Sequence, residues 1–157
     1  MQVTNVTLQR TPTFFEGDVA LRALDEANMV LMVATPDMAS VRAATAALDT
    51  YDKLGYPREK IRMVLNATFP RAGLPRDKIE KALGMAALIT IPYVEDEFVE
   101  AINLGRPLIF HKPQAPVSGL LEDLAFFLSR DTQKKAKPHD PSAAWTRVRK
   151  RYLQRHK

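Results

Sequence analysis

Residues 27–44, ANMVLMVATPDMASVRAA, decide how this chain is expected to fold. A short apolar run over Met29–Val33 stops at Thr35-Pro36-Asp37, and an alanine-rich helical pattern begins at once. Apolar runs without alternation are typical of strands that are buried on both faces of a parallel sheet. The stretch therefore predicts a buried strand followed by its crossover helix, which is the repeating unit of α/β proteins.

The same alternation of strand and helix continues along the chain. Ile61–Leu65 and Ala86–Ile91 predict two more buried strands, and Val3–Leu8 predicts a weaker one. The fold class is therefore α/β, with a partial doubly wound, mainly parallel sheet and flanking helices joined by right-handed crossovers. Helices are expected over Asp18–Ala27, Met38–Leu54, Pro75–Leu83, Glu95–Leu104 and Ser118–Ser129, several of them ending at a glycine.

Helical spacing also predicts which side chains of three helices are buried. The second helix has an apolar stripe with spacings of three and four residues, and the first and last helices have clusters of apolar residues. The residues expected to pack are Val19, Leu21, Ala23 and Leu24 in the first, Val41, Ala44, Leu48 and Tyr51 in the second, and Leu120, Leu121, Leu124, Phe127 and Leu128 in the last.

The composition is that of a soluble protein of a reducing compartment. The 157 residues include no cysteine, which excludes disulfides and thiolate metal sites. No apolar run approaches the roughly 20 residues that span a bilayer, and residues 1–10 do not resemble a secretory signal. The expected location is therefore the cytoplasm, where the C-terminal segment could also attach the protein to a membrane surface.

Positive charge is concentrated near the end of the sequence. The net charge is +5, yet residues 131–157 hold nine Lys or Arg and only two Asp. The chain is therefore divided into a domain at residues 1–130, a polar linker at residues 131–141 and a basic amphipathic tail at residues 142–157.

Direct signs of catalysis are few. The sequence has no G-x-x-x-x-G-K-[ST] motif, and His111, His139 and His156 lack metal-ligand spacing. His111 is expected to be an exposed loop residue. The acidic groups Asp25–Glu26 and Glu95–Asp96–Glu97 fall at predicted helix ends, where the carboxylates of the second group complement the helix dipole. No catalytic residue and no metal site are therefore assigned.

Polar turns follow each of the three buried strands, and in open α/β sheets ligands bind at these strand ends. Asn66, after the second of these strands, is the most informative residue, because its amide both donates and accepts hydrogen bonds, as the edge of a purine base does. The alternative is an ordinary turn residue. Tyr93 and Phe69 near the strand ends could stack on a planar ring, or they could simply pack in the core.

Residues 30–68 resemble part of the second half of the MinD/ParA-type ATPases, the deviant P-loop group, and so does the segment ITIPYVEDEFVEAINLGRPLIF. The second segment has the family's Ile-Pro turn and its A-x-N-x-G-x-P run. LGYPREKIRMVLN is most similar to the pilus-assembly, CpaE/TadZ-type branch. The resemblance covers about residues 11–128. It implies a bacterial protein with a P-loop NTPase-like fold that binds ATP at the strand ends. It also implies that the protein forms dimers, which control where the protein lies in the cell.

The resemblance also implies roles for particular residues. Asn66 would contact adenine, and Pro92, Tyr93 and Val94 would close over the base. The family's phosphate loop and its strand have no counterpart here, so ATP and Mg²⁺ are expected only if that loop is supplied elsewhere. Arg10 occupies the place where the family's switch has an Asp that helps to hold Mg²⁺. Without the loop strand, Val3–Leu8 lacks its usual neighbour, so it pairs directly with Met29–Val33, stays loose, or leaves a gap that a second chain fills. Oligomerisation or an atypical N-terminal segment is therefore expected.

Three interpretations compete for the basic tail. It is a solvated, frayed helix outside the fold, an amphipathic helix on an anionic membrane, or a non-specific contact to DNA phosphates. The tail has a short apolar stripe of Trp145, Val148, Tyr152 and Leu153 among its basic residues. The candidate contact residues for membrane or nucleic acid are Trp145, Arg147, Arg149, Lys150, Arg151 and Arg155.

The resulting functional prediction is a degenerate or truncated MinD/ParA-like protein of the pilus-assembly type. It would act through protein interaction and cellular positioning, without hydrolysing ATP on its own, as a homo-oligomer or with a complete MinD/ParA-like partner. One alternative is a fragment of an active ATP-hydrolysing relative. Another is a stand-alone α/β binding module whose basic tail contacts membrane or DNA.

Overall fold

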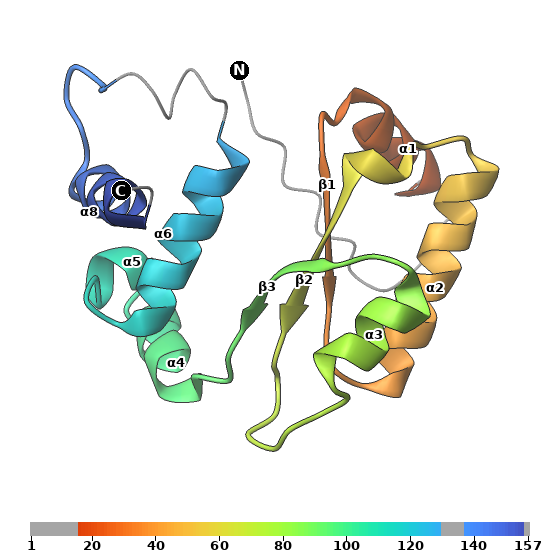
Figure 1. Ribbon diagram of the computed structural model, residues 1–157, viewed down its shortest axis with the longest axis horizontal. Coiled ribbons are helices and arrows are strands. Elements are labelled where there is room, and N and C mark those ends of the chain that lie inside the picture. The colour runs from red at the N-terminus through yellow and green to blue at the C-terminus, as the bar shows by residue number, and fades with distance from the viewer. Residues whose placement is uncertain (1–15, 130–136, 156–157) are drawn as a thin grey trace. The chain divides into compact units, whose positions relative to one another are not determined.

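The computed structural model describes residues 16–129 and 137–155 (Figure 1). They form two compact units, one made of the described residues up to Asn66 with Arg71–Thr90, and the other of Ala67–Pro70 with the described residues from Ile91 onward. The expected strand Val3–Leu8, the switch residue Arg10 and most of the expected linker lie outside the described residues.

The first unit is a three-stranded parallel sheet in the order β1-β2-β3, which confirms the α/β fold class. β1 and β2 pair in parallel from Val30 opposite Ile61 to Ala34 opposite Leu65. The three expected strands that lie within the described residues are present, with ends that differ by at most one residue. The elements of this unit are α1 (Glu16–Glu26), β1 (Val30–Ala34), α2 (Met38–Lys53), the 3-10 turn η1 (Arg58–Lys60), β2 (Ile61–Asn66), α3 (Arg76–Leu83) and β3 (Ala87–Ile91).

Helices α1, α2 and α3 share one hydrophobic core with one face of this sheet (Figure 1). The stripe predicted for α2 is confirmed, because all four of its residues are buried. Strand β2 contributes Ile61, Met63 and Leu65 to the same core. The α2 helix ends as predicted, since Gly55 adopts a φ of 76° directly after Leu54, a conformation that favours glycine.

Two expectations for the first unit are wrong. Strand β1 is not buried on both faces, because its residues alternate and Val33 is 61% exposed while Leu31 is 37% exposed. Of the four residues of α1 that were expected to pack, Leu24 is buried and Ala23 is half-buried, whereas Val19 and Leu21 are exposed. A helix or strand that contacts a single neighbour buries only the side chains on that side, whatever the composition of the other side.

The second unit is helical. Ala101, Leu108 and Val117 form its core, with Ile91, Val94, Phe98, Ala115 and Leu121 packed around them. Ser118 ties two helices together, because its hydroxyl donates to the carbonyl oxygen of Lys112 at 2.7 Å. The helices are α4 (Glu95–Asn103), α5 (Leu108–His111), α6 (Pro116–Leu128) and α8 (Ala143–Arg155). No helix in residues 16–129 or 137–155 has the length and apolar character to cross a membrane.

The second unit corrects two further expectations. Helix α5 was not predicted, because four residues between Pro107 and Pro113 are too few to show a helical period. In α6 the buried residues are Val117, Ser118, Glu122 and Phe126, whereas Phe127, which was expected to pack, is exposed. The buried face of α6 includes the carboxylate of Glu122, and the spacing of apolar residues cannot predict a buried charge.

Candidate functional site

The turn at the carboxyl end of β1 is held by its own side chains. Asp37 caps α2, because its Oδ1 accepts a hydrogen bond from the Ser40 amide at 2.8 Å. The Thr35 hydroxyl donates to the other carboxylate oxygen, and the Ser40 hydroxyl accepts from the Thr35 amide at 2.9 Å. The bond from Thr35, with that from the Ser40 amide, lowers the pKa of Asp37 below its ordinary value. These polar groups therefore already have protein partners.

The loop between β2 and α3 closes over the same turn. The Leu74 amide donates to the carbonyl oxygen of Pro36 at 2.7 Å. Gly73 lies so close that a Cβ atom there would be 2.1 Å from the same oxygen. Only glycine fits at this position without displacing backbone, so the contact fixes how the loop leaves the strand end.

The residues predicted to contact a purine base lie at the ends of two strands. Asn66 ends β2, is half-buried and belongs to the first unit. Pro92, Tyr93 and Val94 follow β3 and belong to the second unit, where Val94 occupies the N-cap position of α4. That all four bind one base stays a prediction.

Tyr93 contacts the acidic first turn of α4. Its hydroxyl donates to a carboxylate oxygen of Glu95, and this hydrogen bond raises the pKa of Tyr93 above its ordinary value. Glu95, Asp96 and Glu97 occupy the first turn of α4, as predicted from the helix dipole. With its hydroxyl engaged, Tyr93 can offer a base the face of its ring.

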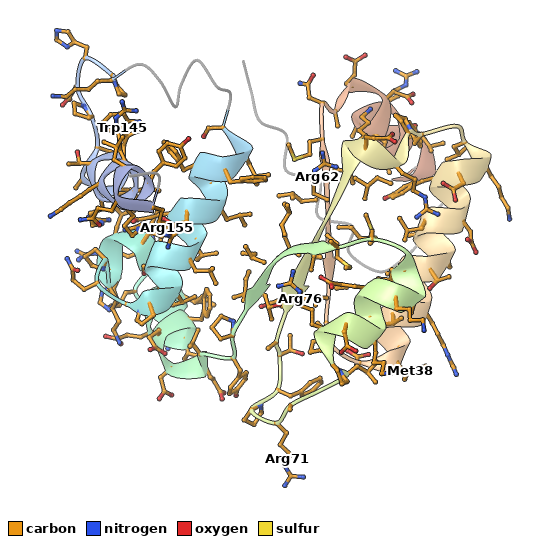
Figure 2. All side chains as sticks on the ribbon, viewed as in Figure 1. Met38, Arg62, Arg71, Arg76, Trp145 and Arg155 are labelled. Carbon is orange, nitrogen blue, oxygen red and sulfur yellow. The ribbon has the colours of Figure 1, made fainter. Side chains whose placement is uncertain are left out.

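The polar and cationic groups near these strand ends bear on whether a triphosphate could bind there. The polar groups of the β1 turn are engaged, and Arg71 in the β2–α3 loop projects away from the ribbon (Figure 2). Among the residues that the structure describes, no cluster of three or more His, Asp or Glu is arranged to hold a metal ion. That these strand ends bind a base without its phosphates stays a prediction.

Helix α8, predicted to contact an anionic partner, packs on α6. Val148 is buried at 5% exposure, and the ring of Tyr152 lies 5.2 Å from that of Phe126. The interpretation of the tail as a frayed helix outside the fold is therefore wrong. Trp145 lines a hollow of about 190 Å³ together with Val148 and Phe126. Figure 2 labels Trp145 and Arg155 at the two ends of α8.

Three of the predicted contact residues pair with acidic side chains of α6. Arg147 and Arg151 both donate to Glu122, the latter at 2.8 Å, and Arg151 also pairs with Asp123 at 2.7 Å. Arg155 pairs with Asp123 at 3.0 Å. Sequence reasoning missed Glu122 and Asp123. Their only signal is a pair of acids inside an apolar helix, matched by three arginines spaced four residues apart.

The other predicted contact residues of α8 lie elsewhere on the helix. Lys150 is exposed. The Arg149 guanidinium lies over the Trp145 ring, 5.2 Å from its centroid. These residues could meet an anionic partner while α8 is docked, and their role stays a prediction.

His111 is not the exposed loop residue that was expected. It ends α5, its side chain is mostly buried, and its Nε2 lies 2.9 Å from Oε1 of Glu100 on α4. Lys112 pairs with the same carboxylate. The bonds from Lys112 and His111 lower the pKa of Glu100 below its ordinary value. The side chains of Glu100, His111 and Lys112 therefore connect α4 to the end of α5, which gives His111 a structural role.

One solved structure connects this geometry to a known class of protein. The chain is similar to the crystal structure of a ParA family ATPase from Chlorobium tepidum TLS, with a TM-score of 0.64 and 26% sequence identity. The match covers 70% of this chain and 46% of that chain, so this chain spans less than half the length of that protein. No family model matches the sequence, and no curated protein matches it.

The fold of this chain is therefore an α/β fold similar to the P-loop NTPase-like fold of ParA proteins. The likeness supports a MinD/ParA-like relationship for this chain.

Proposed function

We propose that this chain is a MinD/ParA-like protein of the pilus-assembly, CpaE/TadZ type that acts by protein interaction and cellular positioning. The similarity to a ParA family ATPase supports the relationship, and the LGYPREKIRMVLN segment supports the branch. We further propose that these 157 residues do not hydrolyse ATP on their own. It is supported by the absence of a phosphate-loop motif from the sequence and by the engaged polar groups at the end of β1.

The observation that carries the interaction role is the exposed face of β1. Leu31 and Val33 project from the face opposite the helix-covered core, and they belong to a strand with the wholly apolar sequence VLMVA. Parallel strands of this kind are normally covered on both faces. A second protein surface would bury these side chains at about 25 cal/mol for each Å² of apolar area. The partner we propose is a second copy of this chain, with a complete MinD/ParA-like protein as the alternative.

Nucleotide binding is proposed only for the base. Asn66 would hydrogen-bond adenine, and Pro92, Tyr93 and Val94 would pack against it. A base held without its phosphates binds weakly, because the triphosphate normally contributes the charged contacts.

Calorimetric titration with ATP and Mg²⁺, compared with adenosine, tests this part of the proposal. Equally weak binding of both, reduced in Asn66→Ala, supports a base site without a phosphate site. Clear binding that depends on the phosphates and on Mg²⁺ would contradict it. That second outcome would favour the alternative, in which this chain is part of an active ATPase, and a hydrolysis assay with the same sample would then decide.

The basic helix α8 completes the proposal as a peripheral contact to an anionic membrane. Its apolar and cationic residues have the composition of helices that lie in the membrane interface. The alternative is non-specific contact to DNA, which the same cations would favour in a salt-dependent way. Vesicle sedimentation distinguishes the two, because a membrane helix binds anionic vesicles at a salt concentration that releases DNA.

A further inference from the structure

The amino ends of β2 and β3 border a hollow of about 550 Å³ in the first unit. Its lining residues come from η1, the start of β2, the end of α3 and the start of β3. Asn66 lies at the carboxyl end of β2, so the hollow and the predicted base site are at opposite ends of this strand. Hollows of about 300–1,000 Å³ are of the size that holds small organic molecules.

Much of the lining of this hollow is apolar. Ile61 and Leu83 are buried residues of the hydrophobic core, and Met85 and Leu88 are half-buried. Atoms that face a hollow have no packing partners on that side. An apolar ligand would supply those contacts and would remove apolar area of both surfaces from water. The hollow is therefore suited to a ligand with an apolar body.

A guanidinium group without a carboxylate partner also lines the hollow. Arg62, labelled in Figure 2, is half-buried and donates through Nη1 to the carbonyl oxygens of Glu59 at 2.6 Å and Ile61 at 3.1 Å. Within residues 16–129 and 137–155 it forms no ion pair. Both hydrogen bonds use one nitrogen, so the donors on Nε and Nη2 remain for a ligand. Such a pair of donors matches the oxygens of a carboxylate or phosphate.

Two further charged residues line the hollow and decide its electrostatic sign. Arg58 is already matched, because its Nε donates to Oδ1 of Asp52 at 2.7 Å. Glu59 carries a negative charge, but it is exposed, and water and salt screen the charge of an exposed group. The charge of a half-buried group is screened less, so Arg62 outweighs Glu59 for a ligand inside the hollow. The ligand that fits is therefore an anion.

We propose that this hollow binds a small organic anion that has one carboxylate or phosphate group on an apolar body. The apolar body lies against Ile61, Leu83 and Leu88, and Arg62 binds the anionic group through Nε and Nη2. This inference does not depend on nucleotide binding or on a membrane contact, because it uses other residues of the chain.

Calorimetric titration of the full 157-residue chain tests the chemistry of the ligand. Octanoate and octyl phosphate are the probes, used below the concentrations at which they form micelles. Octanol lacks the charge, octylamine reverses it, and acetate and inorganic phosphate lack the apolar body. We expect saturable, one-to-one binding of octanoate or octyl phosphate, at least about tenfold tighter than that of any of the other four compounds. The stronger of the two probes shows whether the site prefers a carboxylate or a phosphate.

Charge variants test the role of Arg62. Arg62→Gln should weaken binding of the preferred anion about tenfold, which corresponds to about 1.4 kcal/mol, and should leave octanol unaffected. Arg71→Gln makes the same charge change at an exposed residue outside the hollow and should bind as the wild type does. Glu59→Gln removes the opposing charge and should tighten binding. Because Glu59 is exposed, this last variant tests the sign of the charge even if Arg62→Gln does not fold.

A filling variant locates the ligand. Ala86 lines the hollow and is exposed, so Ala86→Phe places a ring there and should abolish binding. Ala82→Phe, at an exposed position of α3 outside the hollow, is the matched control and should bind normally. Thermal unfolding checks that every variant is folded.

Each contrary outcome overturns a stated part of the proposal. If neither octanoate nor octyl phosphate gives saturable binding, the hollow is not a site for such anions. Binding that survives in Ala86→Phe would place the ligand elsewhere on the protein. Unchanged affinity in folded Arg62→Gln would remove Arg62 from the site, and tighter binding of octylamine than of octanoate would reverse the charge of the ligand.

Discussion

Arg151 of α8 donates a hydrogen bond through Nη2 to Oε2 of Glu122 on α6, at 2.8 Å, and the receiving carboxylate is almost completely buried. Arg147 occupies the other oxygen of the same carboxylate. A buried charge with two opposite partners is tolerated, whereas one that loses its partners is strongly unfavourable. This relationship explains why a helix with five basic residues packs on an otherwise apolar helix.

The stability of α8 docking should depend on Glu122 far more than on the outer ion pair. We expect Glu122→Ala to lower the free energy of unfolding by about 3 kcal/mol, because it leaves two guanidinium groups partly buried without their shared acceptor. Arg155→Ala should change it by less than about 0.5 kcal/mol, because Arg155 is 66% exposed. Urea denaturation of both variants measures the difference. Equal losses of unfolding free energy in the two variants would contradict a larger contribution from the buried carboxylate of Glu122.

Gly73 should tolerate no side chain. A Cβ atom at this position would lie 2.1 Å from the Pro36 carbonyl oxygen, so Gly73→Ala must displace the loop and is expected to cost about 2 kcal/mol. Gly119→Ala is the matched control, since the nearest atom there is 3.9 Å away and alanine favours the helix by about 0.5–1 kcal/mol. Thermal unfolding should therefore move in opposite directions for the two variants. A shared direction would contradict the close contact at Pro36.

The cap of α2 should make stability depend on pH in the acid range. The pKa of Asp37 is lowered in the folded protein, so its contribution is present above the ordinary aspartate pKa of about 3.9 and is lost as the pH falls through the folded value. The melting temperature of the wild type should exceed that of Asp37→Asn at neutral pH, and the difference should shrink below about pH 4.

A variant without a titrating change provides the control for this cap. Ser40→Ala removes the acceptor of the Thr35 amide and should lower the melting temperature by an amount that does not vary with pH. A difference between wild type and Asp37→Asn that stays constant down to pH 3 would show that the carboxylate charge is unimportant to the cap.

Self-association should depend on the exposed face of β1. Val33 is 61% exposed, so Val33→Lys should leave the melting temperature nearly unchanged while it weakens any association through this face. Val99→Lys, at an exposed site on α4, is the control for added charge. Sedimentation velocity over a range of concentrations measures both. A wild type that stays monomeric throughout would rule out a second copy as the partner and leave the complete MinD/ParA-like protein.

Local patterns were sufficient for the elements of the first unit. The three described strands and α2 were predicted to within one residue, because apolar runs and a terminating glycine act over a few residues. The turn residues at the strand ends were likewise identified. The pairing of the Leu74 amide with Pro36 was not predicted, since it joins residues that are far apart in the sequence.

Exposure was the property that local patterns predicted least well. Val33 and Phe127 are apolar residues within apolar segments, yet both are exposed. His111 was expected in a loop but ends a helix beside Glu100. A side chain's burial depends on which element packs against it, and that neighbour is not encoded within a window of ten or fifteen residues.

The sequence by itself determined the α/β class and the order of the described strands and helices, because hydrophobic period and capping are local properties of the chain. The candidate base-contacting residues came from its resemblance to MinD/ParA-type ATPases and stay a prediction. Only the tertiary structure shows where the basic helix packs, which is on α6. From the sequence, Arg147 and Arg151 are compatible with three interpretations, as solvated, membrane-bound or DNA-bound charges, and only the structure places Glu122 opposite them. An isolated cation has no preferred partner, and the desolvated carboxylate that fixes its role lies about 25–29 residues away in the chain.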